Sequence, residues 1–435
     1  MRNLSVKKIW FVIYMFLAIF EPPILPVSFI YILGVLTAGL LLVKYGTRIP
    51  LYIPRKTRIT KILLFFIFGA AYLIVVSLID VMFIETVDLT TNRMRCINQL
   101  LILSFIQFIA IIYILQMADE LSYGLKDILK NMAIAGALQG VCAVAAYTVP
   151  SIRSLFIRFG DSALFNNAYF VERRGFGFSM TLIDTFGYGM GLLAGYLLLQ
   201  KWEKNKIWTF SALVLMLFAI SVNARTGLVI FAIAIVLKIM QGENKVKQIG
   251  KIIVAIPIAY LGIFRLLPEL FRLGVNSTNV TVKWVAVDMQ ELYTTLLYGK
   301  STGASLSDAS FFSHFGNLPK NPFEFILGSG HSIYDTSAQL GFRTDIGYIN
   351  LWWEFGLLGL IILLAVLFVW MSKPLLFVKD TNIRSILILN IVSYFIVLFK
   401  AILIGYNPGV FVNYLCVFAI YYYYDTGYRL ERRMM

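Results

Sequence analysis

Arginines beside apolar segments are the residues of this chain best suited to chemistry on an anion. Arg173 and Arg174 lie shortly before the apolar segment that begins at residue 180. Arg225 lies between two apolar segments, and Arg343 lies just before the segment that begins at residue 346. An arginine guanidinium keeps its charge, and its planar fork binds two phosphate oxygens at once. This set of residues therefore predicts a binding site for a diphosphate.

Three other side chains could accept a proton from a hydroxyl group bound near these arginines. His331 lies in the glycine-rich sequence LGSGHSIY at 327–334, and a histidine titrates near neutral pH. Asp345 and Glu354 are competing bases that flank the start of the next apolar segment. A loop histidine is more often only a polar loop residue, so the sequence leaves the identity of the base open.

Further polar residues are predicted to complete the site. Lys400 and Tyr348 are expected to contact the diphosphate or a glycan, and Asp184 and Glu354 to orient the other side chains. These charged residues all fall near the predicted outer ends of apolar segments. A charge inside a membrane segment is costly and is usually functional. The structural alternative is that these charges only pair with one another.

A bundle of membrane helices must position these residues. Hydrophobic residues make up 59% of the 435 and charged residues only 14%, which a soluble core does not explain. Apolar windows of about 20 residues, the length that crosses a bilayer, recur along the chain. We predict an all-α polytopic membrane protein with about twelve transmembrane helices, at 6–20, 24–44, 62–83, 97–117, 132–149, 180–200, 207–222, 226–240, 251–267, 346–371, 385–404 and 409–424.

The net charge of +15 follows the predicted topology. With both termini cytoplasmic, the excess of lysine and arginine lies in the predicted cytoplasmic segments, in line with the positive-inside rule. No basic face then remains for nucleic acid, so we expect no nucleic-acid partner. The chain divides into nine transmembrane helices at 1–267, one long extracytoplasmic loop at 268–345, and three transmembrane helices with a short basic cytoplasmic tail at 346–435.

The long loop is predicted to contain short helices. An amphipathic helix at 280–297 and a second helix at 307–315 would lie on the membrane surface or cap a site. Trp352 and Trp353, just after this loop, are expected to be interfacial anchors. The three cysteines show neither a disulfide framework nor metal-ligand spacing, so we expect no metal or cofactor.

Short motifs in the last two thirds of the chain are similar to motifs of a known protein family. FILGSGH at 325–331, RTDIGYIN at 343–350 and EFGLLGL at 354–360 follow one another, and RGFGFS at 174–179 and NARTG at 223–227 precede or open predicted helices. In order and spacing they resemble bacterial O-antigen and capsular polysaccharide polymerases (Wzy-type), in the O-antigen polymerase/ligase superfamily. One departure is SLSD at 305–308, where such proteins often carry another arginine.

The resemblance implies a metal-independent glycosyl transfer at a bacterial cytoplasmic (inner) membrane, with the active site facing the periplasm or cell exterior. The donor would be an oligosaccharide on undecaprenyl diphosphate, and the acceptor a sugar hydroxyl of a second lipid-linked repeat unit. Arg173, Arg174, Arg225 and Arg343 would stabilise the diphosphate leaving group. Besides membrane lipid, a protein that regulates chain length is an expected partner.

Two other functions fit the same features. A ligase of the same superfamily would move a finished glycan onto another lipid core. A flippase or exporter of the lipid-linked oligosaccharide would also need about twelve helices and a cationic lining, but not a long outer loop with a histidine.

Overall fold

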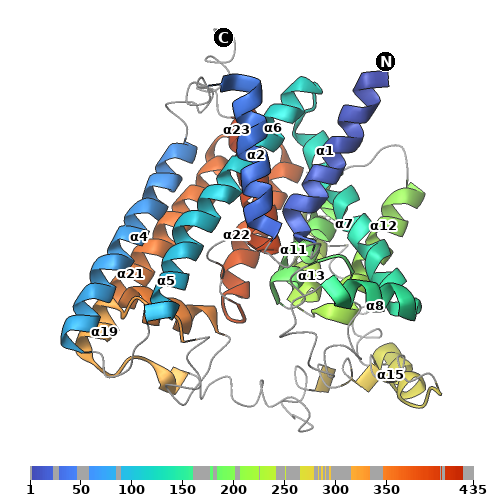
Figure 1. The fold of residues 1–435 in the computed structure, drawn as a ribbon. Coiled ribbons are helices and arrows are strands. Elements are labelled where there is room, and N and C mark those ends of the chain that lie inside the picture. The colour runs from blue at the N-terminus through green and yellow to red at the C-terminus, as the bar shows by residue number, and fades with distance from the viewer. Residues whose placement is uncertain are drawn as a thin grey trace.

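The computed structural model describes most of the chain: residues 2–22, 29–46, 58–84, 90–159, 177–179, 184–200, 206–224, 226–241, 250, 265–278, 315–333, 346–401, 403 and 407–424, with 283, 286–287, 290 and 293–294. Every regular element within these ranges is a helix (Figure 1). An all-helical chain is the expected solution for apolar segments, because a helix satisfies its own backbone hydrogen bonds in lipid.

The helices occur in this order: α1 (Arg2–Phe20), α2 (Phe29–Tyr45), α4 (Arg58–Phe83), α5 (Thr90–Asn98), η2 (Gln99–Leu103), α6 (Ser104–Glu120), α7 (Leu125–Thr148), α8 (Pro150–Phe159), α11 (Asp184–Leu199), α12 (Lys206–Asn223), α13 (Thr226–Met240), α15 (Leu267–Val275), η4 (Phe315–Asn317), α19 (Pro322–Leu327), α21 (Gly347–Ser372), η5 (Lys373–Leu376), α22 (Thr381–Val397) and α23 (Pro408–Tyr424).

Five helical segments of the described chain are long and apolar enough to cross a membrane: Lys61–Phe83, Thr90–Glu120, Leu125–Thr148, Lys206–Asn223 and Gly347–Leu376. Four shorter apolar helices accompany them: Phe29–Lys44, Thr185–Leu199, Thr226–Met240 and Thr381–Val397. Their length and composition are those of a membrane protein. The prediction of an all-helical membrane protein is thus confirmed for the type of element and for the length and composition of these helices.

Most predicted helices agree with helices of the structure to within a few residues at each end. The predicted helix at 251–267 lies outside the described residues except for its last three. In the predicted amphipathic helix at 280–297, the residues that the structure describes are helical. The second predicted loop helix, at 307–315, lies outside the described residues apart from Phe315.

Three predicted helices have wrong boundaries. The helix predicted at 132–149 begins at Leu125, because the charged turn before residue 132 is helical as well. The helix predicted at 97–117 begins at Thr90, because the polar turn before residue 97 is helical and includes buried Asn92 and Arg93. It continues through a short π-helical segment, η2, into α6. The helix predicted at 385–404 instead runs from Thr381 to Val397, since hydropathy detects apolar residues and not helix ends. Its start is capped by Asp380, whose Oδ1 accepts from the Asn382 amide at 2.8 Å.

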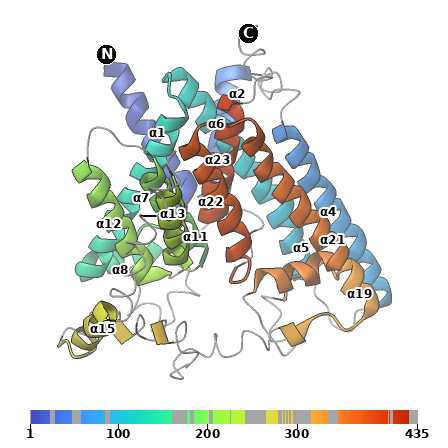
Figure 2. The ribbon, with the colours of Figure 1, turned by 180° about the vertical axis from the view of Figure 1, so that it is seen from behind.

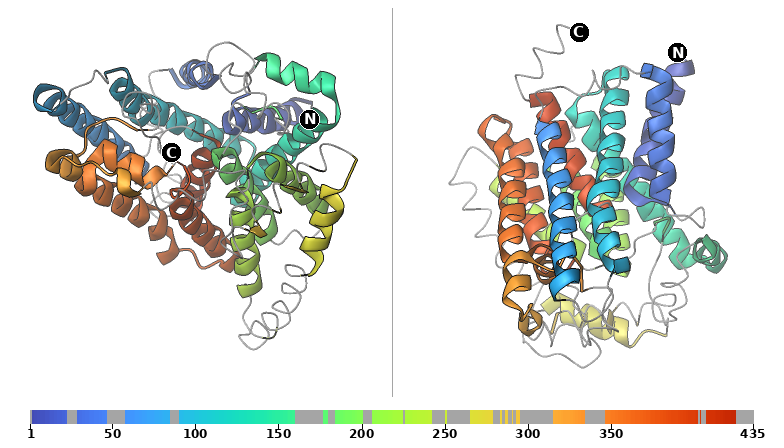
Figure 3. Two further views of the ribbon diagram at one scale, coloured as in Figure 1. Left: turned by 90° about the horizontal axis from the view of Figure 1, so that it is seen from below. Right: turned by 60° about the vertical axis from the view of Figure 1, so that its left-hand side comes forward.

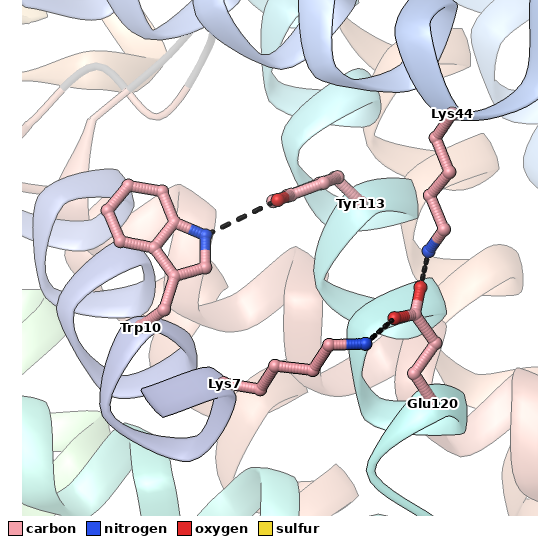
Figure 4. A network of polar contacts seen from close by, with 5 residues as sticks. All are labelled: Lys7, Trp10, Lys44, Tyr113 and Glu120. Carbon is pink, nitrogen blue, oxygen red and sulfur yellow. Dashed lines mark hydrogen bonds and ion pairs between the residues drawn. The ribbon is translucent and has the colours of Figure 1, made fainter. Parts of the chain in front are cut away.

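The beginning of α1 and the end of α23 lie at one end of the bundle, whereas α8, α15 and α19 lie at the opposite end (Figures 1 and 2). The right-hand view of Figure 3, turned about the vertical axis, shows the same separation. At the end of the bundle where α1 begins, Glu120 of α6 forms ion pairs with Lys7 of α1, at 3.1 Å, and with Lys44 of α2 (Figure 4). This carboxylate joins three helices at the end that carries both termini.

Helix α11 is packed closely against α13 through glycines. A Cβ on Gly191 would lie 2.8 Å from the Gly227 carbonyl oxygen, and a Cβ on Gly187 would lie 2.8 Å from the Ala224 carbonyl oxygen. Small residues let helix backbones approach closely, which is a common source of helix association in membranes. The contact brings the start of α11 beside the turn between α12 and α13.

Candidate functional site

Helix α21 is broken near its first third. Gly356 has φ 66° and ψ 177°, which no helix contains. In a continuous helix the carbonyls of Trp353 and Glu354 would accept from amides four residues further on. The break removes these partners, and buried carbonyls without partners would be costly.

The glycine-rich turn at residues 327–333 supplies the missing partners. The Ser329 amide donates to the Trp353 carbonyl at 2.7 Å, and the Gly330 amide donates to the Glu354 carbonyl at 3.1 Å. The Ser329 hydroxyl also donates to the Trp353 carbonyl, at 2.9 Å. The turn therefore fills the break of α21, and two motifs that are separate in the sequence form one unit.

Tyr72 of α4 holds the same unit from the other side. Its hydroxyl lies 2.7 Å from the carbonyl oxygen of Leu327 and 3.2 Å from that of Phe355, so a single phenol bridges the turn and the broken helix. The indole N–H groups of Trp352 and Trp353 donate to Phe325 and Asn317 carbonyls, each at 2.9 Å. These tryptophans therefore fix the approach to the turn, a role that the prediction of interfacial anchors did not include.

A buried polar group from α4 and α5 lies behind the turn. Arg93 and Asp80 form an ion pair in which both side chains are almost completely buried. The Arg93 Nε donates to the Ser329 carbonyl at 3.4 Å, and the Asn92 side-chain amide donates to the Ser332 carbonyl. A buried arginine is tolerable when a carboxylate compensates its charge and its remaining donors find acceptors.

His331 is buried inside the unit, with only 2% of its surface exposed. Its ring centroid lies 5.7 Å from that of Trp353. Burial lowers the pKa of His331 to about 4, and the nearby charge of Arg93 acts in the same direction. The imidazole is therefore neutral at physiological pH, but it is enclosed by protein atoms and does not face solvent.

The lowered pKa of His331 predicts how the stability of the protein depends on pH. The folded-state value of about 4 lies below the ordinary value of 6.5, so acid favours the unfolded chain. The contribution of His331 is intact above pH 6.5 and falls between pH 6.5 and 4, by at most about 3 kcal/mol. Melting temperatures from pH 7.5 to 4.5 should drop less in the His331→Gln variant than in the wild type. Parallel curves for the two proteins would contradict the assignment.

Two carboxyl groups lie beside this unit. The Glu354 side chain is buried, and its Oε1 accepts from the Cys96 thiol at 3.7 Å. Glu324 of α19 is half-buried, and burial together with the charge of Asp80 raises its pKa to about 7. The Glu354 backbone carbonyl accepts from the Gly330 amide of the turn, and the orienting role predicted for its side chain stays a prediction.

Tyr348 and Lys400 lie where α21 begins and α22 ends. The Tyr348 amide donates to the Leu398 carbonyl at 3.2 Å and its hydroxyl donates to the Phe395 carbonyl at 2.8 Å. The Lys400 amide donates to the Val397 carbonyl in the turn that follows α22. The structure therefore brings these two predicted residues into the same region, although the Tyr348 hydroxyl is used in packing.

A second group of predicted residues surrounds the start of α11, on the other side of the bundle (Figure 1). Asp184 is its first residue, and Ala224 and Thr226, which flank Arg225, pack against Gly187. The motif that begins at Arg174 ends against α7, where the Phe178 amide donates to the Gln139 side chain at 3.2 Å. The structure thus places the flanks of Arg225 beside the start of α11, and the segment that follows Arg174 against α7.

Several predicted site residues lie outside the described part of the chain. These are Arg173, Arg174, Arg225, Arg343 and Asp345, and with them the loop histidine His314. Their predicted roles remain predictions.

The residues that hold the turn in place were not among the predicted site residues: Tyr72, Asp80, Asn92 and Arg93. A signal for two of them was present, because Asp80 is an acidic residue inside a long apolar segment and Arg93 lies close to the start of the next one. Charges in such positions usually pair or function. Nothing in the sequence indicated that the pair would contact residues about 240 positions away.

Comparison of the chain with known protein families, curated proteins and solved structures finds no match.

Proposed function

We propose that the protein is a polysaccharide polymerase of the outer face of a bacterial cytoplasmic membrane. It would transfer a glycan from an undecaprenyl-diphosphate donor to a sugar hydroxyl of a second lipid-linked repeat unit. One observation carries the proposal. The motifs at 325–331 and 354–360, which resemble those of the polymerase and ligase superfamily, form a single hydrogen-bonded unit in this chain.

The arginines would bind the diphosphate and stabilise the charge that develops on the leaving group. Arg343 lies four residues before the start of α21 at Gly347, close in sequence to the unit. A preorganised cation near the leaving group lowers the barrier by binding the transition state more strongly than the substrate. Arg173, Arg174 and Arg225 would act on the same diphosphate from the α11 side.

Of the candidate bases, Asp345 suits proton transfer better than His331. A base must approach the hydroxyl within hydrogen-bond distance, and His331 is almost completely buried with a lowered pKa. Asp345 lies two residues before the start of α21. We therefore propose Asp345 as the base and His331 as a residue that stabilises the turn.

This choice predicts different effects for two substitutions. Asp345→Asn should lower the turnover of lipid-linked repeat units about 100-fold, the lower end for loss of a general base. His331→Gln should lower it less than about tenfold, because it changes packing and not proton transfer. Turnover is compared at equal amounts of folded protein. The opposite order of effects would assign the base to His331.

The decisive experiment for the proposed function uses purified protein in detergent with lipid-linked repeat units as both donor and acceptor. A polymerase lengthens the glycan without a sealed membrane, and the products form a ladder on a gel. A ligase leaves the repeat units unjoined unless the final lipid core is added. Loss of the gene would also separate these two, since loss of a polymerase leaves single repeats on the final carrier and loss of a ligase leaves it bare.

Transport is the second candidate, and one observation favours it. Broken helices such as α21 are frequent at the substrate sites of transporters. A flippase or exporter would move the lipid-linked oligosaccharide across vesicle membranes, and it would not lengthen the glycan in detergent. Glycan lengthening in detergent excludes transport as the sole activity.

A further inference from the structure

Two consecutive polar residues near the start of α5, Asn92 and Arg93, reach across to the turn at residues 327–333. The Arg93 Nε donates to the Ser329 carbonyl at 3.4 Å, and the Asn92 side-chain amide donates to the Ser332 carbonyl. Both side chains are buried. The first turn of α5 therefore contacts the glycine-rich turn at two points three residues apart.

The ion pair with Asp80 fixes the orientation of Arg93. Their side chains are only 4% and 3% exposed, so neither exchanges its partner for water. Asp80 lies near the end of α4 and Arg93 near the start of α5, and the pair joins these two helices. With one side of its guanidinium held by Asp80, Arg93 can direct its Nε to the turn.

The contacts continue from the turn into α21. The Ser332 hydroxyl donates to the Asn350 side-chain oxygen at 2.9 Å. Ile333, at the end of the turn, belongs to a buried cluster with Ile346, Ile349 and Trp353. Hydrogen bonds through Ser329 and Ser332 therefore connect Asn92 and Arg93 to residues of the first third of α21.

From this arrangement we infer that Asn92 and Arg93 are positioning residues for glycosyl transfer. They hold the turn against the first third of α21, and so fix the start of the helix that begins two residues after Asp345. Their burial excludes contact with a substrate, which separates them from the catalytic residues. The role of Asp345 rests on the proposed function, whereas the coupling of α5 to the turn and to α21 does not.

The mildest test is Asn92→Ala, which removes one donor to the turn and leaves the ion pair. We expect kcat to fall about tenfold with KM nearly unchanged, because small misplacements of reacting groups reduce the rate more than the binding. Asn98→Ala is the matched control, since Asn98 lies on the same helix and its side chain donates to Tyr31 of α2 at 2.7 Å. Equal kcat values in the two variants would overturn the inference.

A charge swap tests whether Arg93 does more than neutralise Asp80. The double variant Asp80→Arg, Arg93→Asp keeps an ion pair but places no donor at position 93 for the Ser329 carbonyl. Its melting temperature should recover relative to Arg93→Asp alone, while its kcat stays low. Recovery of kcat together with stability would show a purely structural ion pair and would contradict the inference.

Hydrogen–deuterium exchange separates this inference from the proposed function. In Asn92→Ala, amides in peptides covering residues 327–333 and 346–353 should exchange faster than in the wild type and in Asn98→Ala. Unchanged exchange would overturn the inference whatever the protein transfers. Faster exchange in a protein whose wild type forms no glycan would support the coupling and reject the polymerase.

Discussion

Replacing Gly356 by alanine is expected to destabilise the protein by about 4 kcal/mol, the sum of backbone strain and overpacking. Only glycine readily adopts the φ of 66° and ψ of 177° found at this position. A Cβ would also overlap the Ile326 carbonyl oxygen and the Gly328 amide nitrogen. The substitution therefore forces the turn out of the break in α21 and leaves the carbonyls of Trp353 and Glu354 without donors.

The measurement is the melting temperature of the detergent-solubilised protein, together with the yield of monodisperse protein. Gly39→Ala is the matched control, because a Cβ on Gly39 of α2 would have no atom within 4 Å. Alanine in a helix interior is favoured over glycine by about 0.5–1 kcal/mol, so this variant should melt at or above the wild-type temperature. Indistinguishable melting of Gly356→Ala and Gly39→Ala would show that the broken helix is not a feature of the folded protein.

The largest effect on activity is expected from Arg343→Ala. If its guanidinium contacts the leaving group, its loss should reduce turnover about 100- to 1000-fold, like the loss of one oxyanion-stabilising donor. The fall should appear mainly in kcat, because the charge on the diphosphate grows as the glycosidic bond breaks. Turnover is measured as lengthening of lipid-linked units in detergent.

Arg272→Ala is the control for the loss of an arginine from the predicted outer loop. Arg272 lies in α15 and forms an exposed ion pair with Glu269, with a shortest distance of 2.7 Å. Exposed pairs contribute little to stability, and we expect wild-type turnover from this variant. Wild-type glycan lengths from Arg343→Ala, at normal protein levels, would remove Arg343 from the proposed mechanism.

The helices were predictable because lipid restricts what a spanning segment can be. Segments such as α4 and α13 are apolar over the length that a bilayer requires, and their ends agree with the prediction to within a few residues. Helix ends were predicted less well where polar residues take part. The start of α5 reads as a polar connection in the sequence, and it is helical because Asn92 finds a buried partner in the turn at 327–333 and Arg93 finds one in α4.

The candidate site was predictable in part. The glycines at 328 and 330 indicated a tight turn, and the structure contains one with positive φ at both positions. The break at Gly356 was not predicted, because the sequence around it has the composition of an ordinary apolar helix. The burial of His331 beside Trp353 was not predicted either, because it depends on a contact between the turn and α21.

The sequence by itself determined that this chain is a helical membrane protein with a glycine-rich turn before a long apolar segment. Local composition is sufficient for this, because the bilayer selects apolar helices and positive φ selects glycine. Only the tertiary structure decided that the turn fills a break in α21 and that Asp80 and Arg93 support it. Such contacts join residues more than 200 positions apart, and they depend on how helices pack and not on the residues adjacent in sequence.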